Sequence, residues 1–193
     1  MPVAFENAQL PFVSIEHYLS SSRQPMTHPM VLQLRFTRSE FLRSIKNVSD
    51  EDASRRFLPM NCLSWNVGHL AWQEQQYFLH YGQGLLPLPE IGQAFAYGAQ
   101  ASTPSLKEMV AAWKLITETA DPWLDTLTTA SLQENVISRG KPIAYKYGNL
   151  LQRVIYHYWY HLGENMAIRQ LIGHERLPSF VGSIDKKAPY HPE

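Results

Sequence analysis

The sequence contains one cysteine, Cys62, among 193 residues. A single cysteine cannot form an intrachain disulfide. It also excludes structural zinc sites built from four cysteines, or from two cysteines with two histidines. Sparse cysteine of this kind is typical of proteins kept in a reducing, intracellular environment.

The sequence also lacks an excess of charge of either sign. Seventeen basic and seventeen acidic residues give a formal net charge of zero, so the chain has no summed positive field to attract nucleic-acid phosphates. No stretch of about 20 apolar residues occurs, and residues 1–25 lack the basic start and apolar run of a signal peptide. We therefore expect a cytoplasmic protein that binds neither nucleic acid nor a membrane.

Apolar and aromatic residues are plentiful, at 45% and 12% of the chain, which is enough for a folded core. The length predicts one domain rather than two. Residues 1–27 show no sustained period, and we interpret them as an irregular arm. We place the domain in residues 28–182 and interpret residues 183–193 as a C-terminal tail.

Four segments carry apolar residues at the three- and four-residue spacing of amphipathic helices. They cover about residues 28–48, 61–82, 104–127 and 149–173. Thr103 or Ser105 would cap the third helix, and Pro122 would kink or restart it. Such helices bury their apolar sides most simply against one another. The sequence therefore predicts an all-α fold, an antiparallel four-helix bundle with at least one long crossover.

The segments between these helices have different compositions. Residues 49–56 form a polar connection, and residues 82–104 hold seven glycines and prolines, which predicts a long loop between the second and third helices. A short hairpin fits before the fourth helix, around residues 139–142.

Two histidines, His157 and His161, are four residues apart in the fourth predicted helix. Side chains at this spacing share a face, with Cβ atoms about 5–6 Å apart, and two imidazoles can then bind one metal ion. Two core histidines, each hydrogen-bonded to a carbonyl or a tyrosine hydroxyl, would give the same pattern. Glu164 lies three residues after His161. It either accepts a hydrogen bond from a ring N–H or is an ordinary exposed glutamate. Asn165 and Arg169 also fall on the apolar side, which periodicity does not explain.

One face of the second predicted helix combines aromatic rings with amides and a histidine. Its members include His69, Trp65, Trp72, Gln73 and Gln76. This mixture is typical of a pocket wall, where rings cover a ligand and polar tips orient it, although a partly exposed amphipathic face would look the same. Cys62 lies seven residues before His69, and we interpret it as a packing residue outside the site.

The stretches SWNVGHLAWQEQQYF (64–78), HYWYHLGENMAIRQLIG (157–173) and LPSFVG (177–182) resemble the DinB-like superfamily, also called the YfiT-like metal-dependent hydrolases. That family has a histidine in a G-H-L turn of the second helix, an H-x3-H pair in the fourth, and an acidic residue shortly after the pair. The corresponding residues here are His69, His157, His161 and Glu164.

The resemblance covers most of residues 28–182. It implies a four-helix bundle whose three histidines bind one divalent metal ion, usually discussed as nickel, zinc or iron, and it often implies a homodimer. It does not imply a single reaction. Characterised relatives include transferases and isomerases that use the thiols bacillithiol or mycothiol, and the family's link to DNA damage concerns expression rather than DNA binding.

Three histidine ligands would leave a coordination position open for chemistry on a small-molecule substrate. In the first hypothesis, a low-molecular-weight thiol loses its proton there and attacks an electrophile held between Trp65 and Trp72. In the second, metal-bound water hydrolyses a bond while Gln73 or Gln76 orients the substrate and Glu164 orients or accepts a proton. In the third, the chain is a non-enzymatic metal-binding stress protein. The resemblance slightly favours thiol chemistry.

Overall fold

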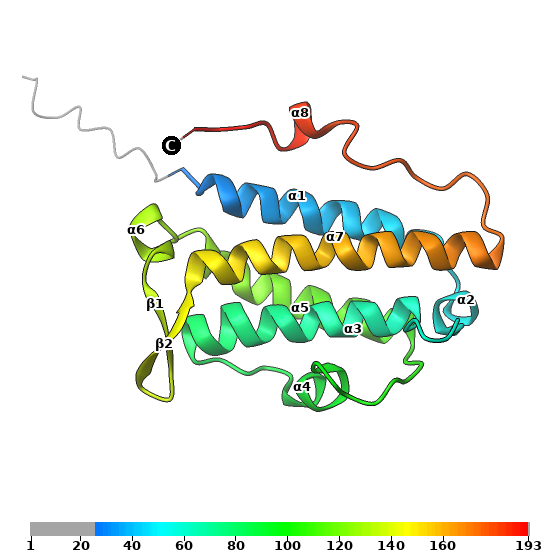
Figure 1. The fold of residues 1–193 in the computed structure, drawn as a ribbon, viewed down its shortest axis with the longest axis horizontal. Helices are drawn as coiled ribbons and strands as arrows, with labels where there is room; N and C mark the ends of the chain where they lie inside the picture. The colour runs from blue at the N-terminus through cyan, green and yellow to red at the C-terminus, as the bar shows by residue number, and fades with distance from the viewer. Residues whose placement is uncertain (1–25, 193) are drawn as a thin grey trace, which may run out of the picture.

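The computed structural model describes residues 26–192, which fold mainly into helices (Figure 1). The all-α fold class is confirmed. The predicted arm over residues 1–27 lies outside the described residues except for its last two. The long helical segments are α1 (Pro29–Ser44), α3 (Leu63–Glu74), α5 (Leu106–Leu124) and α7 (Tyr147–Ile172), and α3 continues into the π-helical segment η2 (Gln75–Tyr81).

The ends of these helices follow from local capping chemistry. The Ser105 hydroxyl accepts a hydrogen bond from the Glu108 N–H, so α5 starts after Ser105 rather than after Thr103. Gly173 ends α7 with a positive φ of 86°, a conformation that glycine adopts without steric cost. Pro122 lies in the last turn of α5, which continues to Leu124, so the predicted restart does not occur.

The long helices pack side by side, but they are not all antiparallel as predicted (Figure 1). Helices α3 and α5 run parallel, since Gly68 lies beside Met109 near one end and Gly82 lies beside Trp123 near the other. A connection over residues 82–105 returns the chain to the starting end between them. This is the predicted long crossover, and it makes the parallel pair possible.

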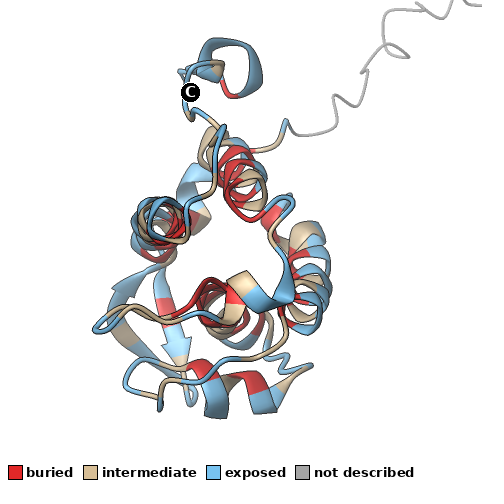
Figure 2. Cartoon of the chain, turned by 90° about the vertical axis from the view of Figure 1, so that its right-hand side faces the viewer, coloured by how far each residue is buried: buried red, intermediate tan, exposed pale blue. Residues whose placement is uncertain are grey.

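Helix α7 runs antiparallel to α3. Asn66 contacts Asn165 near one end of the pair, and the Tyr147 hydroxyl donates to the Tyr81 carbonyl near the other. Helix α1 packs along α7 in the same direction. Viewed along the helices, the buried residues face the centre of this arrangement (Figure 2).

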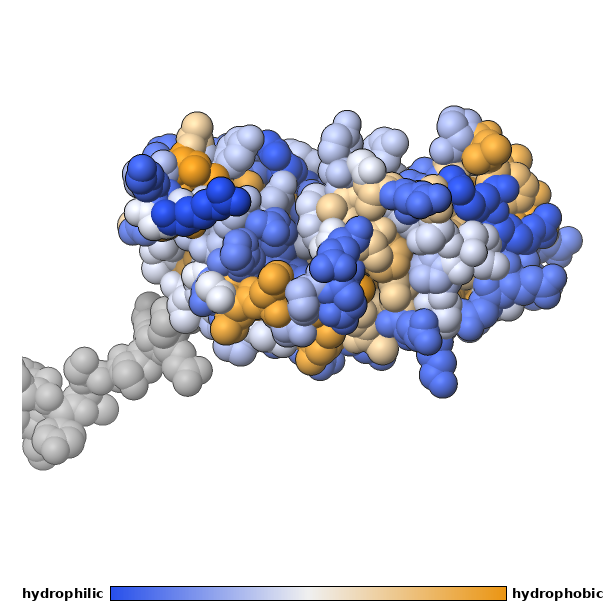
Figure 3. Space-filling model, turned by 90° about the horizontal axis from the view of Figure 1, so that it is seen from below, coloured by the Kyte–Doolittle hydropathy of each residue, from blue (hydrophilic) through white to orange (hydrophobic). Residues whose placement is uncertain are grey.

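Short elements occupy three segments that the sequence analysis treated as loop or tail. These are α2 (Asp50–Ser54) in the polar connection, α4 (Pro89–Phe95) in the crossover and α8 (Ile184–Lys187) in the tail. The Gln75 side chain fixes the crossover, because its amide both donates to and accepts from the backbone of Leu88. Leu85 and Leu86 of the crossover are exposed, and the face carrying α4 shows separate apolar groups among polar ones (Figure 3).

The predicted hairpin is present before α7. After α6 (Thr129–Leu132), strands β1 (Asn135–Ser138) and β2 (Lys141–Lys146) pair in antiparallel fashion. Arg139 and Gly140 between them both have positive φ, as a tight two-residue hairpin turn requires. None of the helices in residues 26–192 combines the length and the apolar character needed to cross a membrane.

A buried polar network connects α1, α3, α5 and α7. The Arg38 guanidinium forms two bonds to the Glu74 carboxylate and donates to Asp121 Oδ1 at 2.7 Å. Tyr158 Oη donates to Glu74 Oε1 at 2.6 Å, and Trp113 Nε1 donates to Tyr158 Oη. Burial acts to lower the pKa of Arg38, but the charge of Glu74 outweighs it and raises that pKa above its ordinary value. The network therefore keeps a full ion pair inside the core.

Candidate metal centre

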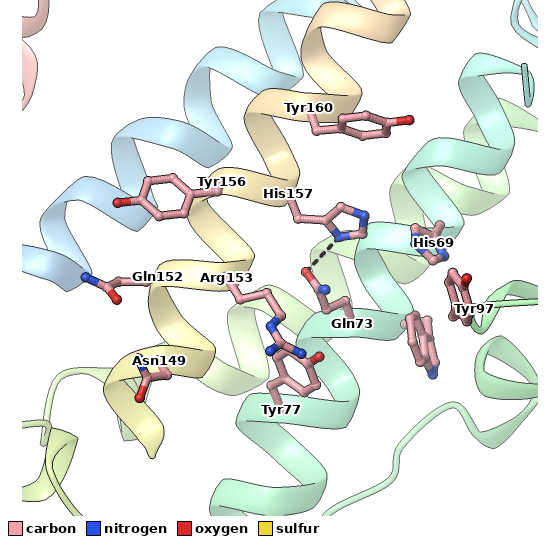
Figure 4. A pocket seen from close by; sticks show the side chains of 11 residues that line it. His69, Gln73, Tyr77, Tyr97, Asn149, Gln152, Arg153, Tyr156, His157 and Tyr160 are labelled. Atoms are coloured by element: carbon pink, nitrogen blue, oxygen red, sulfur yellow. Dashed lines mark hydrogen bonds between the residues drawn. The ribbon is translucent and has the colours of Figure 1, made fainter. Parts of the chain in front are cut away.

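Helices α3 and α7 bring three histidines to one point. His157 and His161 lie on successive turns of α7, and the His69 ring on α3 contacts both of their rings. Figure 4 shows His69 opposite His157. One candidate ligand nitrogen from each ring lies within 4.8 Å of the other two. His69 and His161 are buried and His157 is half-buried. The histidine from the second predicted helix and the pair from the fourth therefore form one cluster.

Each ring in this cluster has an oxygen atom beside its Nδ1. The partners are the Phe95 carbonyl for His69 at 2.6 Å, the Gln73 amide oxygen for His157 at 2.9 Å and the Glu164 carboxylate for His161 at 2.8 Å. An oxygen acceptor favours the tautomer that carries its proton on Nδ1, which leaves the lone pair on Nε2. The Nε2 atoms of His157 and His161 are 3.0 Å apart. Two lone pairs that face each other at this distance repel unless a proton or a cation lies between them.

The electrostatic environment keeps two of these rings neutral. Burial lowers the pKa of His69 to about 4 and, together with the nearby His161, lowers that of His157 to about 3. Neutral imidazoles are the form that binds a divalent ion, and nickel, zinc and iron all accept them as ligands. The donor set present here therefore fits the divalent metal ion that the resemblance implies.

Glu164 lies behind the cluster rather than within it. Its Oε2 atom accepts from His161 Nδ1 and also from the Asn66 side-chain amide at 2.9 Å. Asn66 donates to Asn165 Oδ1 as well, at 3.0 Å, and Asn165 donates to Ser44 Oγ. The carboxylate is thus in place to orient the His161 ring, and the position of Asn165 on the apolar side is explained. Sequence reasoning did not predict the contact between Asn66 and Glu164.

The other residues selected on α3 have different surroundings. Trp65 is buried, and its ring stacks on His69 with centroids 4.8 Å apart. Trp72 and Gln73 line the pocket beside the histidines, whereas Trp65 and Gln76 do not. Gln76 lies in η2, whose wider turn changes the helical phase after residue 74. Cys62 is buried against Ser64 and the Ser102 carbonyl, outside the histidine cluster.

A pocket of about 720 Å³ opens beside His69 and His157 (Figure 4). Its aromatic lining consists of Trp72, Tyr77, Tyr97, Tyr156 and Tyr160. Among the lining residues Arg153 carries the single permanent charge. Sequence reasoning missed Arg153 and the tyrosines, although Arg153, Tyr156 and Tyr160 repeat at helical spacing around His157, a signal that could have identified this face.

Gly68 has no Cβ, which allows Met109 and Phe95 to pack closely against α3 beside His69. A Cβ atom at this position would lie 2.8 Å from both Met109 Sδ and the Phe95 ring. Phe95 supplies the carbonyl that accepts from His69, so a displaced Phe95 would release this ring. We expect Gly68→Ala to lower the free energy of unfolding by about 1–3 kcal/mol and to weaken metal binding about 10-fold or more.

Urea unfolding and metal titration measure the two effects of Gly68→Ala. Gly163→Ala is the matched control, because a Cβ at Gly163 in α7 meets nothing within 4 Å and alanine favours the helix. Equal stability and metal affinity in the two variants would contradict the assigned role of Gly68.

The comparisons with known proteins identify the family of the chain. A search of curated protein sequences gives no match to the chain. The family model described as DinB superfamily matches residues 33–164, more than half of the chain, and the matched segment includes His69, His157, His161 and Glu164. The chain belongs to the DinB superfamily.

Proposed function

We propose that this protein is a metal-dependent enzyme that activates a low-molecular-weight thiol for transfer to, or isomerisation of, a small electrophile. The observation that carries the proposal is the position of the three histidines beside an open pocket lined by aromatic rings. A divalent ion held by His69, His157 and His161 would favour the thiolate form of a bound thiol.

The residues of the chain have separate tasks in this proposal. Gln73, Glu164 and the Phe95 carbonyl orient the histidine rings through Nδ1. Trp72 and the pocket tyrosines hold the electrophile, while Trp65 supports His69 from behind. The thiol sulfur forms a new bond to carbon of the electrophile, and the bond from that carbon to its leaving group, such as a halide, breaks, so that the group departs as an anion. The thiol proton leaves to solvent through the open pocket.

The lining of the pocket favours thiol chemistry over hydrolysis. Metal-dependent hydrolysis is helped by a carboxylate that accepts a proton from the attacking water. No Asp or Glu is among the pocket-lining residues of the described chain, and the nearby Glu164 is held by His161 Nδ1 and Asn66. A thiolate is a nucleophile without such a base.

An assay panel separates the three candidate functions. The metal-loaded protein is incubated with bacillithiol or mycothiol and an aryl halide, and in parallel with an activated ester without thiol. We expect thioether formation that disappears in His157→Ala and persists in His80→Ala, which changes a histidine outside the cluster. Ester hydrolysis without thiol would support the hydrolase instead, and bound metal without turnover would support a non-enzymatic protein.

Arg153 gives the pocket a preference for negatively charged ligands. Its guanidinium lies 5.4 Å from the centroid of the Tyr145 ring and forms no ion pair within the described residues. A charged hydrogen bond contributes about 1.5–3 kcal/mol. Arg153→Gln should therefore raise KM for an anionic thiol or electrophile about 10- to 100-fold and leave kcat nearly unchanged.

Steady-state kinetics with paired anionic and neutral substrates measure this effect of Arg153. Neutral substrates serve as the internal control, and Arg153→Lys should recover part of the affinity because it keeps the charge. If KM rose equally for neutral substrates, the residue would shape the pocket rather than select charge.

A further inference from the structure

Helices α1 and α7 end at the same end of the bundle (Figure 1). A second hollow, of about 740 Å³, is lined by residues from the ends of these two helices and from the segments that follow them. It shares no lining residue with the pocket beside the histidines. We call it the α1/α7 end pocket. Its charged lining residues are Arg43, Lys46, Arg169, Arg176 and Glu175, with His174 beside them. The lining is therefore mostly basic, in a chain without net charge.

Arg169 is a buried cation in the wall of this pocket, held in place by hydrogen bonds. It is 7% exposed, and its Nη1 donates to the Ser44 carbonyl at 2.8 Å while Nε donates to His174 Nδ1 at 3.1 Å. No carboxylate contacts it within the described residues. A buried cation without a counter-ion is costly, and an anion in the adjoining space would reduce that cost.

His174 is not a counter-ion for Arg169. Its Nδ1 accepts from Arg169, so its proton lies on Nε2, which donates to Asp52 Oδ2 at 3.2 Å. The ring therefore lies between Arg169 and the Asp52 carboxylate. The unused edge of the guanidinium remains available to a ligand in the pocket.

The remaining charges favour an anion by a small margin. Lys46 and Arg176 are exposed and form no ion pair within residues 26–192, whereas Arg43 Nη1 pairs with Glu40 Oε2 at 2.6 Å. Glu175 and the C-termini of α1 and α7 oppose the binding of an anion. Each helix C-terminus carries about half a negative elementary charge. Arg169, Lys46 and Arg176 still outweigh these contributions, and Arg169 already binds one of the terminal carbonyls of α1.

We propose that the α1/α7 end pocket binds a dianion of the phosphate class, either inorganic phosphate or the phosphate group of a larger molecule. Phosphate oxygens accept several charge-assisted N–H bonds at once, from a planar guanidinium and from an ammonium group. A carboxylate offers fewer acceptor sites and half the charge. This site is separate from the metal centre and does not depend on the proposed enzymatic activity.

Isothermal titration of the full metal-loaded chain tests the site. Inorganic phosphate and phenyl phosphate are titrated at constant ionic strength, with chloride and acetate as comparison anions. We expect saturable binding of phosphate that weakens at least 10-fold in the double variant Lys46→Gln/Arg176→Gln. Both changes are at exposed positions, so the fold is kept. The control is Lys107→Gln/Lys114→Gln, which removes two charges from exposed positions on α5.

The outcomes distinguish the sources of the phosphate group. Equal binding of phenyl phosphate supports a larger phosphorylated ligand, and binding of inorganic phosphate alone supports the free ion. Acetate binding as tightly as phosphate would overturn the assignment, as would the absence of saturation. Equal weakening in the control variant would also overturn it, because the effect would then come from overall charge.

Discussion

We expect His157→Ala to leave a folded protein that no longer holds a metal ion at the histidine cluster. Zinc binding by four ligands contributes about 10–16 kcal/mol in small zinc domains, so one ligand corresponds to roughly 3 kcal/mol. Each 1.4 kcal/mol is a factor of ten, which predicts an affinity reduced about 100-fold or more. His157 is half-buried, and its loss also removes one of the two Nε2 lone pairs that face each other at 3.0 Å. We therefore expect little change in the stability of the metal-free form.

Metal content and thermal unfolding with and without a chelator measure this result. A bound ion stabilises the folded state by mass action, so a chelator should lower the Tm of the unmodified protein and leave the Tm of His157→Ala unchanged. His80→Ala is the control and should behave like the unmodified chain. Full metal stoichiometry in His157→Ala would contradict the proposed ligand set.

His69→Ala distinguishes a three-histidine centre from a pair on one helix. His157 and His161 alone could chelate an ion through their four-residue spacing, but His69 comes from α3. If metal stoichiometry remained unchanged in His69→Ala, the third ligand would be wrong. The packing of α3 against α7 at the histidine cluster would then not serve to complete a metal site.

The largest effect on stability is expected for Arg38→Met, which leaves the Glu74 carboxylate buried without its partner. Breaking a buried ion pair from one side costs about 3–5 kcal/mol. In a protein of this size the Tm should fall by about 6–20 °C. Methionine keeps much of the side-chain volume, so the loss of stability comes from the missing positive charge rather than from a cavity.

Urea unfolding measures this cost. Arg35→Met is the matched control, because Arg35 also lies on α1 and pairs with Asp125, but both side chains are partly exposed. Exposed pairs contribute about 0–1 kcal/mol. The double variant Arg38→Met/Glu74→Gln should recover part of the lost stability. Similar losses for Arg35→Met and Arg38→Met would show that the buried network does not carry the stability assigned to it.

Local patterns in the sequence were sufficient to predict the helices and the histidine pair. Four-residue spacing places His157 and His161 together whatever surrounds them, and amphipathic periodicity marks the long helices. Periodicity does not fix the order in which helices pack, so the parallel α3 and α5 were not foreseen. It also assigns arginine to the surface, whereas Arg38 is buried by its bonds to Glu74.

Contacts that depend on the crossover could not be predicted in the same way. The Phe95 carbonyl reaches His69 only because α4 folds against α3, and glycines and prolines predicted a loop in that segment. Gln76 was selected by counting α-helical turns from His69, but the π-helical segment η2 changes that count. Tyr77 lines the pocket instead.

In two pairs of neighbouring residues, one side chain belongs to the metal centre and the other belongs to the buried polar network. On α3, Gln73 orients His157 while Glu74 binds Arg38. On α7, His157 belongs to the histidine cluster while Tyr158 donates to Glu74. Adjacent residues on a helix point about 100° apart, so a single stretch of backbone anchors both. A displacement of α7 relative to α3 would thus have to break the buried hydrogen bond from Tyr158 to Glu74 before it could change the spacing of the imidazoles, which ties the geometry of the histidine cluster to the packing of the core.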